Sequence, residues 1–141
     1  MSDIDDVVEA LAARIRTGMA GDTIAGRTYA YGIDSINPPS AIVLPSNGDF
    51  VDYDVTFDGK DDFELVVKVL MGSQDDRTGQ AQLLAYLARS GSTSLREAIY
   101  GDSSLGGACS DLKVVGARNF GDVEWAGQIF YGAELVVQVY A

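Results

Sequence analysis

The sequence predicts an α+β fold, in which a mostly antiparallel β-sheet carries an N-terminal helix and a second helix packed on one face. Three observations lead to this prediction: an N-terminal helical stripe of apolar residues, several runs in which apolar and polar residues alternate, and a second helical segment in mid-chain. The connections between the alternating runs resemble hairpins, which join antiparallel strands. We expect residues 1–141 to form a single domain of this kind.

The first helix is expected over Asp3–Thr17. Its apolar residues recur at helical spacing and form one stripe, made of Ile4, Val7, Val8, Leu11 and Ile15. Acidic residues occupy its first turn and arginines its last, which suits the helix macrodipole at both ends. We interpret the glycine-rich stretch that follows, Gly18–Gly26, as a flexible connection.

Four strands are expected in the first half of the chain, over Arg27–Ile33, Ala41–Leu44, Val51–Phe57 and Phe63–Met71. Apolar residues alternate with acidic ones in the third of these runs, as in a half-buried strand whose polar face meets water. Asp58-Gly59 is a pair favoured in hairpin turns, so we expect it to join the third strand to the fourth.

One face of the Phe63–Met71 strand is fully apolar and needs cover. The helical segment that follows supplies it, with Leu83, Leu84 and Leu87 interpreted as core residues and Gly91 as the residue that ends the helix.

A short third helix is expected after it, because Ser94-Leu95-Arg96-Glu97 matches a capping box. Leu112–Asn119 is interpreted as a strand and Gly121-Asp122 as a turn. The run Gln128–Ala141 alternates for longest and is expected to be the longest strand, at or near the centre of the sheet.

The charge balance is acidic, with 10 basic and 21 acidic side chains and a net charge of −11. Such a surface repels phosphate backbones, so we expect weak binding to duplex DNA. No apolar run approaches the ~20 residues that span a bilayer, and the N-terminus is acidic where a signal peptide is basic. We therefore expect a soluble protein that does not bind membranes.

No catalytic, cofactor-binding or metal-binding residues are assigned from the sequence. The chain has no histidine, which excludes ordinary Ser-His-Asp and Cys-His catalysis. Asp54–Gly59 begins like a calcium loop, but Leu65 stands where that loop needs a bidentate glutamate. The single cysteine, Cys109, cannot form an intrachain disulfide, which fits an intracellular origin, and we interpret it as an inert small residue because Lys113 is the only basic residue near it.

Several segments occur in the order of a known family: Phe63–Met71, Asp75-Asp76-Arg77, Gln82–Leu87, Ser94–Tyr100, Leu105–Gly107 and Tyr131–Val139. Over residues 58–141 the chain resembles the tail terminators, or tail completion proteins, which are minor tail proteins of long-tailed bacteriophages. Residues 18–47 have no match in this resemblance.

The resemblance implies a small structural α+β subunit of the virion that needs no cofactor. Such subunits assemble in the host cytoplasm as a homo-oligomer, a hexameric ring, at the head-proximal end of the tail. The ring caps the tail tube protein, ends tube polymerisation and joins the tail to the head–tail connector or adaptor proteins. DNA passes through the ring without tight binding.

Three loops are candidates for ring and tube contacts, by way of Asp58 and Gly59, then Asp75, Asp76 and Arg77, and finally Leu105, Gly106 and Gly107. Two other functions remain open at this point. One is a head-closure or adaptor ring protein of the phage neck. The other belongs to a different class, a small α+β binding module or enzyme of unknown substrate.

Overall fold

The computed structural model describes residues 4–31, 38–46, 50–53, 60–72, 77–125 and 127–141. Its elements are α1 (Ile4–Gly18), the 3-10 helix η1 (Thr23–Arg27), β1 (Thr28–Ala30), β2 (Ser40–Pro45), β3 (Val51–Asp52), β4 (Asp62–Met71), α2 (Arg77–Tyr86), α3 (Leu95–Tyr100), the 3-10 helix η2 (Leu105–Gly107), β5 (Asp111–Trp125) and β6 (Gln128–Tyr140).

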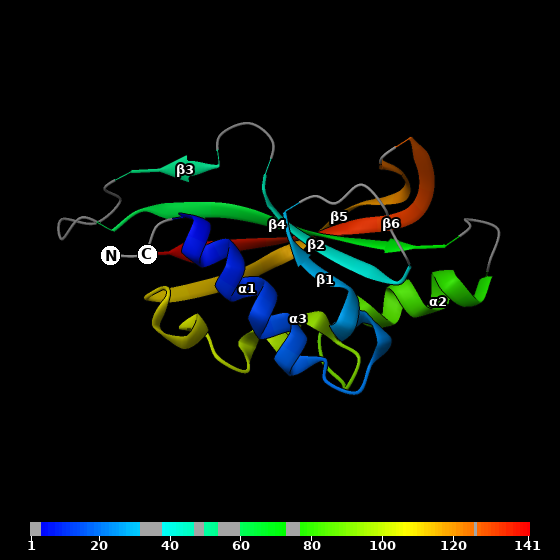
Figure 1. Cartoon of the computed structure of the whole chain (residues 1–141), viewed down its shortest axis with the longest axis horizontal. Helices are drawn as coiled ribbons and strands as arrows, with labels where there is room; N and C mark the ends of the chain where they lie inside the picture. Colours follow the sequence, from blue (N-terminus) through cyan, green and yellow to red (C-terminus); the bar gives the residue numbers. More distant parts are fainter. Residues whose placement is uncertain (1–3, 32–37, 47–49, 54–59, 73–76, 126) are drawn as a thin grey trace.

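The strands form one sheet in the order β1-β2-β4-β6-β5, with β3 paired to the start of β4. β1 and β2 run parallel, and every other pair in the described sheet is antiparallel. The helices lie on one side of this sheet (Figure 1). The predicted α+β class with an N-terminal helix is therefore confirmed. The prediction that the C-terminal strand is near the centre is also correct, since β6 lies between β4 and β5.

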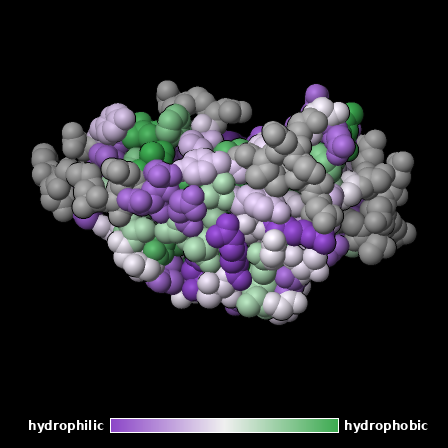
Figure 2. Space-filling model, viewed as in Figure 1, coloured by the Kyte–Doolittle hydropathy of each residue, from purple (hydrophilic) through white to green (hydrophobic). Residues whose placement is uncertain are grey.

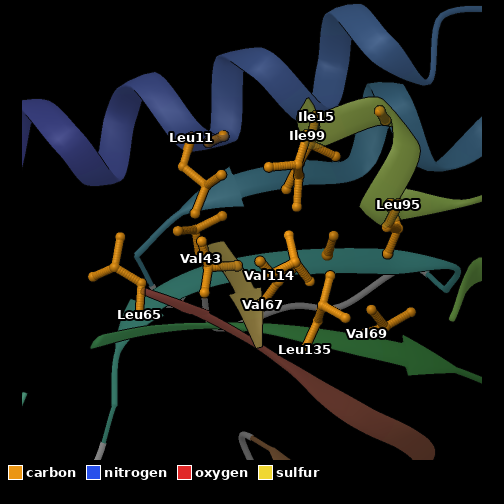
Figure 3. Packing of buried hydrophobic residues seen from close by; sticks show 14 of the residues in the cluster. Leu11, Ile15, Val43, Leu65, Val67, Val69, Leu95, Ile99, Val114 and Leu135 are labelled. Atoms are coloured by element: carbon orange, nitrogen blue, oxygen red, sulfur yellow. The ribbon is translucent and has the colours of Figure 1, made fainter. Parts of the chain in front are cut away.

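The main hydrophobic core fills the space between the helices and the sheet (Figure 3). The apolar face predicted for β4 is buried there in full, through Phe63, Leu65, Val67, Val69 and Met71. Figure 3 shows Leu11 and Ile15 of α1 and Ile99 of α3 directed at this face of the sheet. The period-two pattern of the strand and the helical stripe of α1 thus bury each other, as expected.

The segment after α1 differs from the flexible connection expected over Gly18–Gly26. Asp22 caps η1 by accepting a hydrogen bond from the backbone N–H of Ile24 at 3.1 Å, and the Ile24 side chain is buried. The same Asp22 oxygen accepts a hydrogen bond of 2.8 Å from the hydroxyl of Tyr86 in α2. Burial, together with this carboxylate, raises the pKa of Tyr86. A partner 64 residues away in the chain orders this segment, so local composition could not predict it.

The core role predicted for Leu83 and Leu87 of the second helix is confirmed, but the prediction was wrong for Leu84 and for the end of the helix. α2 ends at Tyr86 rather than near Gly91. Leu83 and Tyr86 are fully buried, Leu87 is half-buried, and Leu84 is 57% exposed. Residues three apart share a helix face, while the residue that follows Leu83 is rotated by about 100°. Because Tyr86 occupies the core, Leu84 is turned toward solvent.

β5 continues well past the strand predicted for Leu112–Asn119. It passes through Gly121-Asp122, which was interpreted as a turn, and ends at Trp125. Register shifts between Val114 and Gly116 and between Arg118 and Gly121 mark β-bulges. Each bulge adds one residue and so interrupts the period-two alternation. The sequence pattern therefore predicts a short strand where the structure has one long strand. β5 has 15 residues and β6 has 13, so the expectation that the last strand is longest was wrong.

The first strand is shorter than expected, whereas β2 (Ser40–Pro45) is slightly longer than the predicted Ala41–Leu44. The run Arg27–Ile33 contributes only Thr28–Ala30, after which Tyr31 adopts a positive φ of 70°. Of the run Val51–Phe57, the structure assigns Val51–Asp52 to a strand, and residues 54–59 lie outside the described residues.

Candidate assembly surfaces

Half of the predicted contact residues lie outside the part of the chain that the structure describes. Asp58, Gly59, Asp75 and Asp76 lie outside the described residues, and Arg77 is the first residue of α2. The structure therefore does not test the first two candidate loops.

The third candidate loop is folded around Asp102. One of its carboxylate oxygens accepts hydrogen bonds from the backbone N–H and the hydroxyl of Ser104, and the other accepts one from the backbone N–H of Gly106. These hydrogen bonds lower the pKa of Asp102. Leu105 is only 5% exposed and packs in the core, which corrects its proposed role as a surface contact. Gly106 and Gly107 are exposed.

The far part of the β5–β6 hairpin forms a second, smaller hydrophobic cluster with the sheet. It curves away on the side opposite the helices (Figure 1). There Phe130 of β6 packs with Ile42 of β2 and Leu70 of β4, and Val123 and Trp125 of β5 pack around them. These contacts hold the hairpin back against the face of the sheet that the helices leave open.

The opposite face of the same hairpin presents apolar side chains to solvent. We call it the outer hairpin face and define it by Phe120 and Ile129; Tyr131 beside them is half-buried and packs against the main core. Ile129 is 66% exposed and Phe120 is 47% exposed. The rings of Phe120 and Tyr131 meet edge to face, with centroids 5.0 Å apart. Exposed apolar groups gathered on one rigid element are typical of surfaces that contact another protein.

A charged network lies at the second bulge of β5. Glu134 of β6, which is only 9% exposed, accepts hydrogen bonds from Arg118 Nε at 3.0 Å and Asn119 Nδ2 at 2.8 Å. Lys68 of β4 lies 3.6 Å from its other oxygen and also stands over the ring of Trp125. Burial opposes the charge on Glu134, but the hydrogen bonds and the two cations outweigh burial and lower its pKa. The network thus joins β4 and β6 to the second bulge of β5.

Replacing Glu134 by glutamine should lower stability at pH 7 by about 2 kcal/mol, because buried charge-assisted hydrogen bonds are lost. The folded-state pKa of Glu134 is depressed, so its contribution is complete above the ordinary glutamate pKa of about 4.3 and is lost as pH falls through the lower folded value. Urea unfolding at pH 7 and at pH 3 should therefore show a smaller difference between wild type and Glu134→Gln in acid. An equal difference at both pH values would contradict this role.

A groove of about 390 Å³ lies between the α2–α3 segment and β5. Three cations line it, from Arg89, Arg96 and Lys113, and no carboxylate does so among the described residues. The Arg96 guanidinium stands 4.8 Å from the centre of the Tyr100 ring and donates a hydrogen bond to the backbone oxygen of Arg89. We call this the basic groove.

The surroundings of Cys109 make its thiol unreactive. Its side chain is 8% exposed and donates a weak hydrogen bond to the Ser103 carbonyl. Burial raises its pKa to about 11, and the charges of Asp111 and Asp102 add to the effect. The thiol is therefore protonated at neutral pH, and the thiolate is the reactive form.

Two features are absent from the described part of the chain. No group of three or more Cys, Asp or Glu side chains is placed to hold a metal ion. No described helix is long and apolar enough to cross a bilayer.

No model of a known protein family matches this chain, and neither does any curated protein. The surfaces described above therefore rest on the geometry of this molecule alone. The sequence analysis did not identify the outer hairpin face, because it interpreted Gly121-Asp122 as a turn, whereas β5 continues through these residues to Trp125. It also missed the basic groove, because Arg89, Arg96 and Lys113 come together only after folding. The available signal for the hairpin was Phe120, a bulky aromatic residue between Asn119 and Gly121-Asp122 in a polar stretch.

Proposed function

We propose that this chain is a structural subunit of a phage virion, a tail terminator whose ring of six copies caps the tail tube. The ring ends polymerisation of the tail tube protein and joins the tail to the head connector, while DNA passes through it. The resemblance over residues 58–141 suggests this function. The observation that supports it best is the outer hairpin face, where Ile129 and Phe120 are exposed on an arm held rigidly from behind.

A terminator must present unlike surfaces to its two neighbours along the tail. A tube grows by repeating one head-to-tail contact, and growth ends at a subunit that offers this contact on one side only. The chain has such unlike sides. Hydrophilic side chains gather over α1 (Figure 2), where Asp5, Asp6 and Glu9 are exposed, while the outer hairpin face, at the far end of the β5–β6 hairpin, is apolar. We assign the outer hairpin face to an axial contact with the tube or the connector.

The test is to disable the gene in its phage and to image the tails. We expect tubes of uncontrolled length that do not join filled heads. Tails of normal length that fail to attach would instead favour a head-closure or adaptor ring of the neck, and normal tails that do attach would refute both structural functions.

The hairpin assignment is tested by complementing that defect with variant genes. Ile129→Asp should fold and still fail to restore joined tails, because it places a charge in an apolar contact. Tyr53→Asp is the matched control, since Tyr53 is 75% exposed and lies outside the hairpin. If the Ile129→Asp gene restored joined tails, the hairpin would not be part of the contact.

A further inference from the structure

The basic groove concentrates positive charge on a strongly acidic protein. The chain has 10 basic residues and a net charge of −11, yet three of the basic residues line this one groove. Arg89 and Lys113 are exposed, and Arg96 is held in place by its contacts with Tyr100 and the Arg89 carbonyl. Such a local reversal of charge attracts carboxylates and repels further cations.

The groove lies beside β5, which forms one edge of the described sheet. The hydroxyl of Tyr100 accepts a hydrogen bond of 2.9 Å from the backbone N–H of Val114, and the bulge after Val114 interrupts the strand. This backbone donor is therefore already used, and a bulged edge is a poor template for another strand. Side-chain charge, rather than strand addition, is what this edge offers to a partner.

At the opposite edge of the described sheet, beside β1, one side of α1 carries two exposed carboxylates and one exposed arginine. Arg16 Nε donates a hydrogen bond of 2.9 Å to the carbonyl oxygen of Thr28 in β1, which marks the side of α1 that faces this edge. Glu9 precedes Arg16 by two helical turns and Asp5 precedes Glu9 by one, so all three share that side. Asp5 and Glu9 are exposed, and no ion pair within the described residues joins them.

We propose that the basic groove of one copy receives Asp5 and Glu9 from the next copy of this chain. This inference rests on the ring in the proposed function and identifies its lateral contact. The two surfaces are different, lie at opposite edges of the sheet and have opposite charge. Each copy therefore offers one surface and receives the other, which is the heterologous contact from which a closed ring is built.

Two charge-reversal variants test the contact. The groove variant is Arg89→Glu with Lys113→Glu, and the helix variant is Asp5→Lys with Glu9→Lys. Native mass spectrometry and sedimentation of each purified variant should show at least tenfold weaker self-association than wild type, because like charges now meet. Mixing the two variants should restore rings with both chains in equal number, since each reversed surface then meets its reversed partner and each natural surface its natural one.

Controls separate this contact from general effects of charge. Asp52→Lys with Glu124→Lys makes the same change in net charge as the helix variant at two exposed positions outside both surfaces, and should leave the ring intact. Circular dichroism checks folding, and the neutral pair Arg89→Gln with Lys113→Gln replaces the groove variant if that variant unfolds. Raising ionic strength from 0.1 to 1 M, where the screening length falls from about 10 to 3 Å, should also weaken the wild-type ring.

The outcomes distinguish this inference from the proposed function. A wild-type protein that stays monomeric would overturn the ring and the contact together. Wild-type rings that persist in both reversal variants would overturn the contact and leave the ring standing. Intact rings combined with loss of duplex DNA binding in the groove variant would show that the groove is a nucleic-acid site, and the inference would be wrong.

Discussion

Leu83→Asp should destabilise the protein by at least about 4 kcal/mol, whereas Leu84→Asp should change its stability by less than about 1 kcal/mol. Leu83 is fully buried between α2 and the sheet, where a carboxylate would be unpaired and cut off from water. Leu84 is 57% exposed and its replacement leaves the core intact. Urea unfolding followed by circular dichroism measures both changes, and the adjacent position serves as the control.

This pair of variants examines the orientation of α2 directly. The two leucines are chemically identical and adjacent in the chain, so helix propensity and net charge change equally in the two variants. Comparable losses of stability would mean that α2 presents a different face to the sheet. If Leu83→Asp left the free energy of unfolding unchanged, α2 could not be part of the hydrophobic core.

Gly132→Ala should also be strongly destabilising, by about 3 kcal/mol. A Cβ atom at Gly132 of β6 would lie 2.4 Å from the carbonyl oxygen of Val69 in the neighbouring strand β4, and 3.2 Å from a methyl carbon of Leu70. The first of these neighbours is backbone, which cannot turn aside as a side chain can. The two central strands, β4 and β6, would have to move apart, and the backbone hydrogen bonds between them would lengthen or break.

The matched control is Gly116→Ala in β5. No atom outside its chain neighbours lies within 4 Å of a Cβ placed there, so this variant should be neutral or slightly stabilising. Thermal unfolding of the two variants measures the difference. If Gly132→Ala proved as stable as Gly116→Ala, β4 and β6 could not approach each other as closely as the structure places them.

Local sequence patterns were enough to predict those elements whose secondary structure and buried face depend only on residues nearby in the chain. The stripe of α1 and the two-sided pattern of β4 follow from periodicity, which any amphipathic element must show. The capping box also forms in part: Ser94 accepts a hydrogen bond from the backbone N–H of Glu97. The carboxylate of Glu97, however, accepts its hydrogen bond from Gly91 rather than from Ser94.

The sequence by itself thus determined the α+β class, the N-terminal helix, the central strands and the acidic surface. Only the tertiary structure decided which leucine of α2 is buried, because that choice depends on Tyr86 reaching Asp22 across the fold. It also decided the path of β5. Glu134 of β6 binds Arg118 and Asn119 at a bulge, and the alternation of apolar and polar residues does not predict a strand that continues through such a bulge. The same holds for both candidate surfaces. Charge at the basic groove and apolar exposure on the outer hairpin face arise from residues that are distant in the chain, and their proximity is a property of packing.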